Sequence, residues 1–324
     1  MKTAIITGIS GQDGPYLAKF LTEKGYKVIG TTRSYTNSNR KNLEYLGIEN
    51  DVLIEELDLL DLANIAHMIK KYKPDEVYNL AAQSSVHMSF EQPIGTFYFN
   101  TQSVNNLIEC IRLFSPHTKL YQASSSEMFG KVNHLPITLE SPMNPVSPYG
   151  ISKMAAHFMI KVYRESYNLY LCNGILFNHE SFLRSQNFFI KKVIRNSILV
   201  KYGKLDKLLV GNLNIKRDFG YAPKYVEAMW KILQVEKPDD YIICSGKSIM
   251  LKDIVYYIFD KLNLDRSRIF VDEKLFRPNE IYDIYGDNTK AKEILKWDYN
   301  MSFYEVLDIL LLEELNFMRN KNEI

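Results

Sequence analysis

Tyr149 and Lys153 are the residues of this sequence whose types and spacing most clearly allow acid–base chemistry. A separation of four residues at the start of an expected helix places both side chains on one face. There the ammonium can lower the pKa of the phenol from its reference value of about 10, so that the tyrosine exchanges protons near neutral pH. Upstream, Ser124-Ser125-Ser126-Glu127 follows an apolar strand pattern, and we expect its hydroxyls and carboxylate to face the same crevice. This set predicts proton transfer on a hydroxyl-bearing substrate.

A glycine-rich loop near the N-terminus predicts a dinucleotide site. The short β-branched strand Thr3–Thr7 leads into Gly8-Ile-Ser-Gly11-Gln-Asp-Gly14, and an amphipathic helix follows. Glycines let the backbone approach a pyrophosphate, and the helix N-terminus offers free N–H groups and a favourable dipole. The alternative is a tight turn that needs glycine at these points.

The ends of the next strands suggest which dinucleotide binds. The strand from Lys27 to Thr31 is followed by Thr32-Arg33-Ser34, where an NAD site usually shows an acidic residue. A positive, hydroxyl-rich pocket suits a 2′-phosphate and favours NADP over NAD, although Arg33 is alternatively a solvated surface charge. Asp58-Leu59 is placed to touch an adenine, and the small residues Ala81 and Ala82 let a nicotinamide ribose lie close to the backbone.

Strands and helices alternate over the first half of the chain. This order predicts a doubly wound parallel sheet whose ligands bind at the carboxyl ends of the strands. Every residue singled out so far lies at such an end. The further strands are expected at 51–57, 76–80, 119–123 and 170–177, with helices at 60–72 and 96–114.

After residue 178 the regular alternation fades, which indicates a smaller C-terminal α/β domain. Its basic helix carries Lys191, Lys192 and Arg195, and Arg217 lies further on. Such charges suit an anionic substrate such as a diphosphate, or else a solvated helix face. Helices are expected at 224–234, 251–262 and 303–317. We expect residues 1–178 to form the cofactor domain, with segments at about 212–245 and 281–290 returning to it, and residues 179–324 to form mainly the substrate domain.

Composition excludes several classes of protein. The net charge is +2 and the basic residues are scattered, so no nucleic-acid partner is expected. Three widely spaced cysteines show neither metal-ligand spacing nor a disulfide framework, which fits a reducing cytoplasm. We expect no metal, and a hydrogen-bonding role for His179. The first apolar run is too short for a signal sequence or a membrane span, so a cytoplasmic protein without membrane contact is expected.

Taken together, these motifs resemble the GDP-mannose 4,6-dehydratase family of the extended short-chain dehydrogenase/reductase superfamily, which has a Rossmann fold. The resemblance extends over about residues 3–297. The segments that carry it are Thr7–Gly14, Asn79–Ser84, Tyr121–Glu127, Ser147–Tyr149 with Lys153, Asn173–Ser181, Lys216–Asp218 and Arg277-Pro278.

The resemblance implies a redox-neutral elimination on a GDP-hexose. Tyr149, assisted by Lys153, takes the proton of the sugar C4 hydroxyl while hydride passes from C4 to the cofactor. The resulting 4-ketone acidifies the C5 hydrogen, which Glu127 removes as water leaves from C6. The hydride then returns to C6 and gives a 4-keto-6-deoxy sugar. Ser125 and Ser126 hold the hydroxyl and ketone oxygens.

The family also implies binding roles for other positions and a homodimer or homotetramer. The implied cofactor residues are Gly8, Ser10, Gly11, Gln12, Asp13, Gly14, Arg33, Asp58, Leu59, Leu80, Ala81, Ala82, Ser84, Tyr149, Lys153 and His179. The implied substrate residues are Ser85, Asn178, Glu180, Arg184, Lys192, Gly211, Arg217, Arg277 and Glu280.

Three departures from the family pattern bear on specificity. Ser125 replaces a threonine, and Arg33-Ser34 replaces paired arginines. The family's Pro-Arg-Arg-Gly-Glu-Thr is Phe182-Leu-Arg-Ser-Gln-Asn187 here; since this stretch is expected to line the sugar pocket, GDP-N-acetylglucosamine and a GDP-heptose stay open beside GDP-mannose. The same Tyr149 and Lys153 also suit a GDP-sugar 4-oxidase, a C4-epimerase or a 4-keto reductase, none of which needs Glu127. A non-catalytic cofactor-sensing protein is the alternative from another class.

Overall fold

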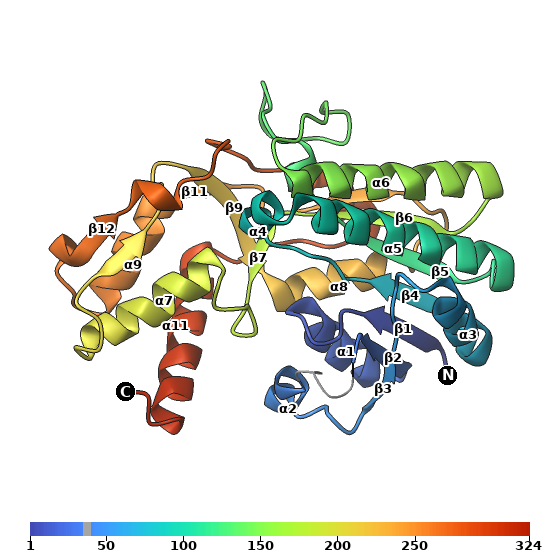
Figure 1. Ribbon diagram of the computed structural model, residues 1–324, viewed down its shortest axis with the longest axis horizontal. Helices are drawn as coiled ribbons and strands as arrows, with labels where there is room; N and C mark the ends of the chain where they lie inside the picture. Colours follow the sequence, from blue (N-terminus) through green and yellow to red (C-terminus); the bar gives the residue numbers. More distant parts are fainter. Residues whose placement is uncertain (35–39) are drawn as a thin grey trace.

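The computed structural model describes residues 1–34 and 40–324 (Figure 1). At its centre is a seven-stranded sheet in the order β10-β6-β5-β4-β1-β2-β3, with every neighbouring pair parallel. The expected doubly wound parallel sheet is confirmed. Its strands are β1 (Thr3–Thr7), β2 (Lys27–Thr32), β3 (Val52–Glu56), β4 (Glu76–Asn79), β5 (Lys119–Ser125), β6 (Leu171–Leu176) and β10 (Asp240–Ile243).

Helices cover both faces of this sheet, as Figure 1 shows for α5 and α6 on one side and α1 and α8 on the other. Successive side chains of a strand point to opposite faces. In β1, Ile5 therefore joins the core beneath α3, α5 and α6, while Ala4 and Ile6 join the core beneath α1 and α8. The helices are α1 (Asp13–Glu23), α2 (Lys41–Leu46), α3 (Leu62–Tyr72), α4 (Val86–Glu91), α5 (Pro93–Phe114), α6 (Pro148–Tyr167), α8 (Ala222–Ile232) and α10 (Thr289–Leu295).

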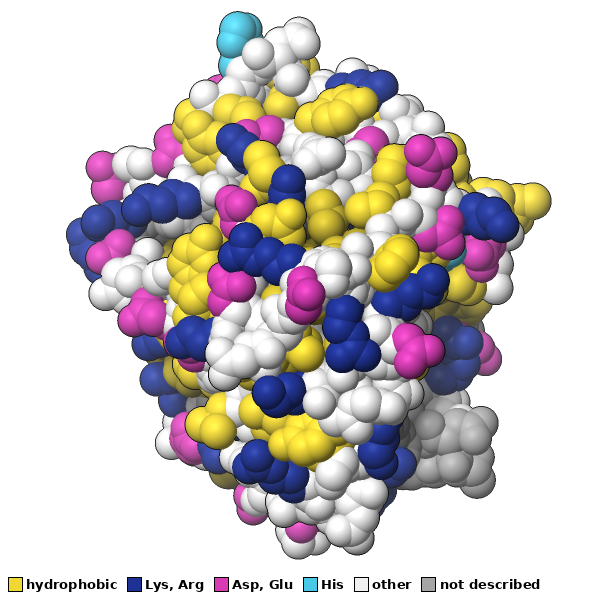
Figure 2. Space-filling view, turned by 90° about the vertical axis from the view of Figure 1, so that its left-hand side faces the viewer, with side chains coloured by type: hydrophobic (Ala, Val, Ile, Leu, Met, Phe, Trp, Pro, Cys, Tyr) yellow, Lys and Arg dark blue, Asp and Glu magenta, His cyan; other side chains and the backbone are white. Residues whose placement is uncertain are grey.

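A second lobe with its own core lies beyond the carboxyl ends of the large sheet. Ile190 of α7, Ile254 of α9 and Val306 of α11 meet in that core. On the face shown in Figure 2, lysine and arginine side chains are dispersed among acidic and apolar ones. The elements are α7 (Phe189–Lys201), α9 (Leu251–Lys261), α11 (Phe303–Asn320), a sheet of β11 (Ser248–Met250), β9 (Lys216–Tyr221) and β7 (Asn178–Glu180), and the pair β12 (Ile269–Val271) and β8 (Leu208–Val210).

The expected strand at 170–177 ends earlier than predicted. β6 ends at Leu176, and the chain then leaves the large sheet, because β7 pairs with β9 in the small sheet. Phe177, at the bend, is buried in a separate apolar cluster. The turn between the two lobes thus falls immediately before Asn178 and His179. Among the described residues, every helix falls short of the length and apolarity that crossing a bilayer requires.

Candidate active site

A cavity of about 1410 Å³ opens where the carboxyl ends of the large sheet face the second lobe. Every residue to which the family resemblance assigns a role lines it, from Gly8 in the glycine loop to Glu280 in the second lobe. Parallel strands explain this convergence, because all their carboxyl ends meet at one edge. Lys191 and Arg195 of the basic helix, which we also expected to suit an anionic substrate, do not line it and instead pair with Glu314. Proximity alone does not assign a role to each residue.

The glycine loop forms a cradle in which side chains would collide with backbone. Gly8 has φ +73°, and a Cβ there would lie 3.0 Å from the Ala81 nitrogen. At Gly14 a Cβ would lie 2.7 Å from the Gly8 oxygen, so the first turn of α1 can pack directly on the loop. Gln12 precedes α1 without capping it through its side chain, which leaves N–H groups at the helix start for an anion. The cradle therefore fits the pyrophosphate of a nicotinamide dinucleotide.

His179 and Asp13 join the glycine loop to the turn between the lobes. His179 Nε2 lies 2.9 Å from Asp13 Oδ2, and Nδ1 lies 2.7 Å from the Phe177 carbonyl oxygen. Burial disfavours the imidazolium, but the Asp13 carboxylate outweighs it and raises the pKa of His179. Both ring nitrogens are thus engaged in polar contacts, as expected. Among the described residues, no group of three or more His, Cys, Asp or Glu side chains is placed to hold a metal ion.

Tyr149 and Lys153 lie in the first turns of α6, whose start is fixed by Ser147. The Ser147 hydroxyl accepts a hydrogen bond of 3.0 Å from the Gly150 N–H, and Pro148 occupies the first helical position. The side chains of Tyr149 and Lys153 are buried, and Lys153 Nζ lies 5.9 Å from the centre of the tyrosine ring. Nζ also donates a 2.9 Å hydrogen bond to the Ala123 carbonyl of β5. The helix is thereby tied to the strand end beside it.

The pKa of Tyr149 is shifted in the direction opposite to our expectation. Burial raises it to about 12, although a hydrogen bond with Ser125 opposes the shift. Burial also lowers the pKa of Lys153 to about 8. Lys153 does not figure among the groups that shift the pKa of Tyr149, so the expected lowering by it is not found, and desolvation of the phenolate dominates.

Glu127 follows β5 in a single 3₁₀ turn (Ser126–Met128), and Ser125 caps that turn by accepting a 3.3 Å hydrogen bond from the Glu127 N–H. This turn sets the carboxylate beside Tyr149, whose pKa it raises slightly. Ser125 and Ser126 border the cavity at the same strand end. The hydroxyl of Ser124, expected to face the crevice with the others, is instead held by two buried neighbours, His157 and Met128.

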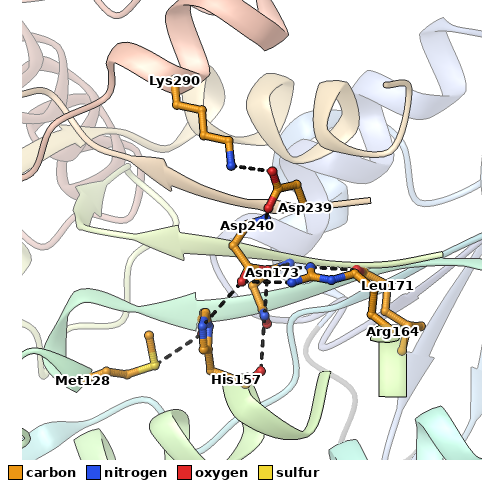
Figure 3. A network of polar contacts seen from close by, with 9 residues as sticks. Met128, His157, Arg164, Leu171, Asn173, Asp239, Asp240 and Lys290 are labelled. Atoms are coloured by element: carbon orange, nitrogen blue, oxygen red, sulfur yellow. Dashed lines mark hydrogen bonds and ion pairs between the residues drawn. The ribbon is translucent and has the colours of Figure 1, made fainter. Parts of the chain in front are cut away.

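A buried polar network behind β5 and β6 joins His157, Asp240 and Arg164 (Figure 3). The contact of His157 with Ser124 explains the orientation of that serine. Ser124 Oγ lies 3.1 Å from His157 Nδ1, and His157 Nε2 lies 3.6 Å from Asp240 Oδ2. Arg164 holds Asp240 through two hydrogen bonds of 2.7 and 3.2 Å. Burial lowers the pKa of His157 in spite of Asp240. The strand end that carries Ser125 and Ser126 is therefore anchored from beneath.

The wall from the second lobe is basic. Arg217 is buried and donates hydrogen bonds to the Ile281 carbonyl at 2.6 Å and to Glu280 Oε1 at 3.1 Å. Arg277 is partly exposed and lies near Glu127, while Lys192 borders the cavity from α7. At Gly211 a Cβ would lie 3.0 Å from the Leu275 oxygen, so two backbone segments can approach closely there. These cations can receive an anionic group.

The stretch that departs from the family pattern reaches the cavity through only two residues, Arg184 and Asn187. Phe182 instead stacks on Tyr45 with ring centres 4.5 Å apart and is buried, as is Leu183. The expectation that the whole stretch lines the sugar pocket is therefore wrong. Aromatic side chains on α2 and α11 offered Phe182 an apolar site away from the cavity.

Several cavity residues were not found from the sequence. His87 and Met88 lie on the short helix α4, which is capped by Ser85 through a 3.2 Å hydrogen bond. A serine before an apolar residue was the available signal, but six residues are too few for a recognisable period. Phe188 and Phe189 line the cavity at the start of α7. In the sequence, such an aromatic pair predicts packing in the hydrophobic core and not a binding site.

Solved structures with the same fold include nucleotide-sugar enzymes that bind nicotinamide dinucleotides. A dTDP-glucose 4,6-dehydratase from Bacillus anthracis in complex with NAD superposes with a TM-score of 0.86 and 19% identity over 98% of each chain. The RMD protein from Pseudomonas aeruginosa, complexed with NADPH, superposes with a TM-score of 0.82 and 21% sequence identity. The match covers 97% of this chain and 99% of that one. The sheet and the glycine loop, together with these likenesses, define a Rossmann fold.

Sequence comparison gives the particular family. The family model described as GDP-mannose 4,6 dehydratase matches residues 5–310. GDP-mannose 4,6 dehydratase 1 of Arabidopsis thaliana is 40% identical over 99% of this chain and 91% of its own length. The human GDP-mannose 4,6 dehydratase is 36% identical over 98% of this chain and 92% of its own length. This chain belongs to the GDP-mannose 4,6-dehydratase family, as the motifs predicted.

Proposed function

We propose that this protein is a hydro-lyase that converts GDP-mannose to the GDP-4-keto-6-deoxy sugar with a bound nicotinamide cofactor. The observation that carries the proposal is the carboxylate of Glu127 beside Tyr149 and Ser125 at one strand end. An oxidation or epimerisation at C4 needs a single proton-transfer group there. Elimination of water across C5 and C6 needs a second one, and a carboxylate suits that role.

The side chains divide the reaction as follows. Tyr149 takes the C4 hydroxyl proton, and Ser125, already hydrogen-bonded to the phenol, holds the sugar oxygen. The bound nicotinamide supplies the hydride acceptor and later donor, and its positive charge when oxidised favours the phenolate. Glu127 takes the C5 proton and delivers it to the C6 hydroxyl, which leaves as water. When the hydride returns to C6, C5 regains a proton that balances the one taken by Tyr149, and the side chains are restored to their starting state. Ser126 holds the ketone oxygen, and Lys153 orients Tyr149 from its bond to Ala123.

We further propose that the cofactor is NADP. Arg33 borders the cavity after β2, with its guanidinium 5.2 Å from the centre of the Phe99 ring, and Thr31 and Thr32 add hydroxyls beside it. A guanidinium held in this way suits a phosphate. Titration of the protein with each dinucleotide tests this directly. Tighter binding of NADP than of NAD is expected, and equal or reversed affinities would contradict the assignment.

The two lobes divide the ligands between them. We assign the dinucleotide to residues 1–178 with 212–245 and 281–290, and the GDP-sugar mainly to the remainder of 179–324. The basic wall of Arg217, Arg277 and Lys192 supports the second assignment. Because the departing stretch meets the cavity only through Arg184 and Asn187, mannose is favoured over an acetamido sugar or a heptose.

We also propose a cytoplasmic homo-oligomer, either a dimer or a tetramer. Three free, buried cysteines suit a reducing compartment. Exposed apolar side chains on α5 and α6, among them Phe97, Tyr98, Phe158 and Val162, support pairing through these helices. Sedimentation of the protein, compared with Phe158→Glu, tests the pairing. A monomeric wild-type protein would contradict it.

A mass-spectrometric turnover panel tests the reaction. Purified protein with NADP is offered GDP-mannose, GDP-N-acetylglucosamine and a GDP-heptose, with UDP-glucose as the control. Loss of one water from GDP-mannose is expected. Loss of two hydrogens with reduced cofactor formed would indicate a 4-oxidase instead. No change in any sugar by a protein that still binds cofactor would indicate a binding protein.

A further inference from the structure

Arg277 contacts the carboxylate of Glu127 across the cavity. Arg277 Nη1 lies 3.8 Å from Glu127 Oε1, which is an ion pair but too long for a hydrogen bond. The arginine comes from the loop after the 3₁₀ turn Glu273–Leu275 of the second lobe, whereas the glutamate follows β5 of the large sheet. A group expected to hold substrate thus pairs with the group expected to remove a proton.

A comparison with Arg217 shows which of the two arginines is free to move. Arg217 is held by the Lys216 and Ile281 carbonyls and by Glu280, and only 5% of its side chain is exposed. Arg277 has 35% of its side chain exposed, and none of the hydrogen bonds found among the described residues involves it. Its pairing with Glu127 can therefore be exchanged for another partner at little cost.

We propose that Arg277 is a positioning residue that holds Glu127 while the cavity lacks a diphosphate and releases it when a nucleoside diphosphate binds. The inference rests on the proposed function. A diphosphate carries more charge than one carboxylate, and a guanidinium binds phosphate oxygens through two parallel hydrogen bonds. A bound diphosphate therefore displaces the Glu127 carboxylate from Arg277, because their ion pair is long and partly exposed.

The exchange couples the nucleotide end of the substrate to the chemistry at its sugar. With Arg277 beside it, the Glu127 carboxylate is engaged by an ion pair on the side of the second lobe. Once Arg277 has turned to the diphosphate, the carboxylate is free to take the C5 proton. The elimination base is thus released only when a diphosphate occupies the cavity beside Arg277.

Reciprocity makes the proposal testable without turnover. If a diphosphate must displace Glu127 from Arg277, removal of the Glu127 charge must tighten diphosphate binding by the same coupling. The probe is GDP, titrated calorimetrically into the NADP-loaded protein. Glu127→Gln is expected to tighten GDP binding about two- to fivefold, the range of partly exposed ion pairs. In the Arg277→Met background the same change is expected to have no effect.

A matched control separates this exchange from simple repulsion. Lys192→Met removes another cavity cation for which no contact with Glu127 is found among the described residues. Glu127→Gln is expected to tighten GDP binding in that background as in the wild type. Equal tightening in the Arg277→Met background would mean that Glu127 only repels the diphosphate at a distance, and would overturn the proposal, as would no tightening in the wild type.

Two checks keep these outcomes distinct. Glu127→Ala, with retained NADP binding as evidence of folding, must reproduce the direction found with Glu127→Gln. GDP that fails to bind the wild-type holoprotein would overturn the proposed function, and this inference with it. If GDP binds and the effects of Glu127→Gln and Arg277→Met on its binding free energy simply add, the inference is overturned but the proposed function is not.

Discussion

The two walls of the cavity are built differently. On the wall formed by β5 and α6, two of the groups assigned to chemistry are buried and already bonded: Lys153 donates to the Ala123 carbonyl, and Ser125 accepts from the Glu127 N–H. On the wall toward the second lobe, charged groups keep unused bonding capacity. Among the described residues, Arg184 Nε and Glu180 Oε2 are buried without hydrogen-bond partners, and their 3.7 Å separation is too long for one.

This difference separates reaction from recognition. A proton-transfer group works best when its geometry is fixed before the substrate arrives. A recognition group gains binding free energy when the ligand supplies its missing partner, because a buried unpaired polar atom costs about 1–3 kcal/mol. Substitutions in the reactive wall are therefore expected to lower mainly the reaction rate. Substitutions in the recognition wall are expected to lower mainly the affinity for the substrate.

The largest effect is expected from Tyr149→Phe. Without the phenol, no group accepts the C4 proton, so the first hydride transfer should slow by about 10²- to 10⁴-fold. Single-turnover absorbance of the reduced cofactor measures this step. Cofactor binding should persist, because the ring remains. Reduced cofactor that accumulates at the wild-type rate would remove Tyr149 from the mechanism.

Glu127→Gln should slow the elimination of water by about 10²- to 10⁴-fold. In contrast to Tyr149→Phe, it should let reduced cofactor accumulate. The C4 oxidation does not need the carboxylate, so reduced cofactor should form and persist while water loss stops. The same absorbance trace, combined with product mass, measures both quantities. Normal water loss from this variant would show that another group removes the C5 proton. Together with Tyr149→Phe, it tests whether one wall carries both proton transfers.

A smaller effect is expected behind the reactive wall. His157→Leu takes one buried polar partner from Ser124 and one from Asp240, while Met128 and Arg164 remain in contact with them. The loss should lower the free energy of unfolding by about 1–3 kcal/mol in urea titrations. Lys161→Ala, at an exposed position of the same helix, should change it by about 0.5 kcal/mol or less. Equal effects of the two changes would show that the network does not anchor β5.

The smallest effect concerns pH. Burial lowers the pKa of His157, while Asp240 opposes the shift and Arg164 and Lys161 reinforce it. The folded state therefore binds fewer protons than the unfolded state in the acid range, and stability rises with pH there. The contribution of His157 should be complete above pH 6.5 or so and decline as pH falls through its folded pKa.

Comparison with His157→Gln isolates this term. The difference in unfolding free energy between wild type and variant should shrink between about pH 6.5 and pH 5. His179 has a raised pKa and contributes with the opposite sign, but it is present in both proteins and cancels. A difference independent of pH would mean that His157 does not titrate differently in the folded state.

The sequence by itself determined six of the seven strands of the large sheet and the residues at its edge, but not β10. β1 is a continuous apolar run, α3 has a strong helical period, and Gly14 is needed by its backbone contact with Gly8 within one loop. Parallel order then brings Gly8, Asp58, Ala81 and Ser125 to one edge without further information. Local patterning was sufficient wherever the elements were long.

Only the tertiary structure decided the rest. The short strands β7, β8 and β12 have three residues each, too few for a readable alternation. Burial reversed the expected pKa shift of Tyr149, and desolvation depends on all surrounding segments rather than on a neighbour in sequence. The burial of Phe182, the engagement of Ser124 by His157 and the pairing of Arg277 with Glu127 likewise join distant segments, which no local pattern encodes.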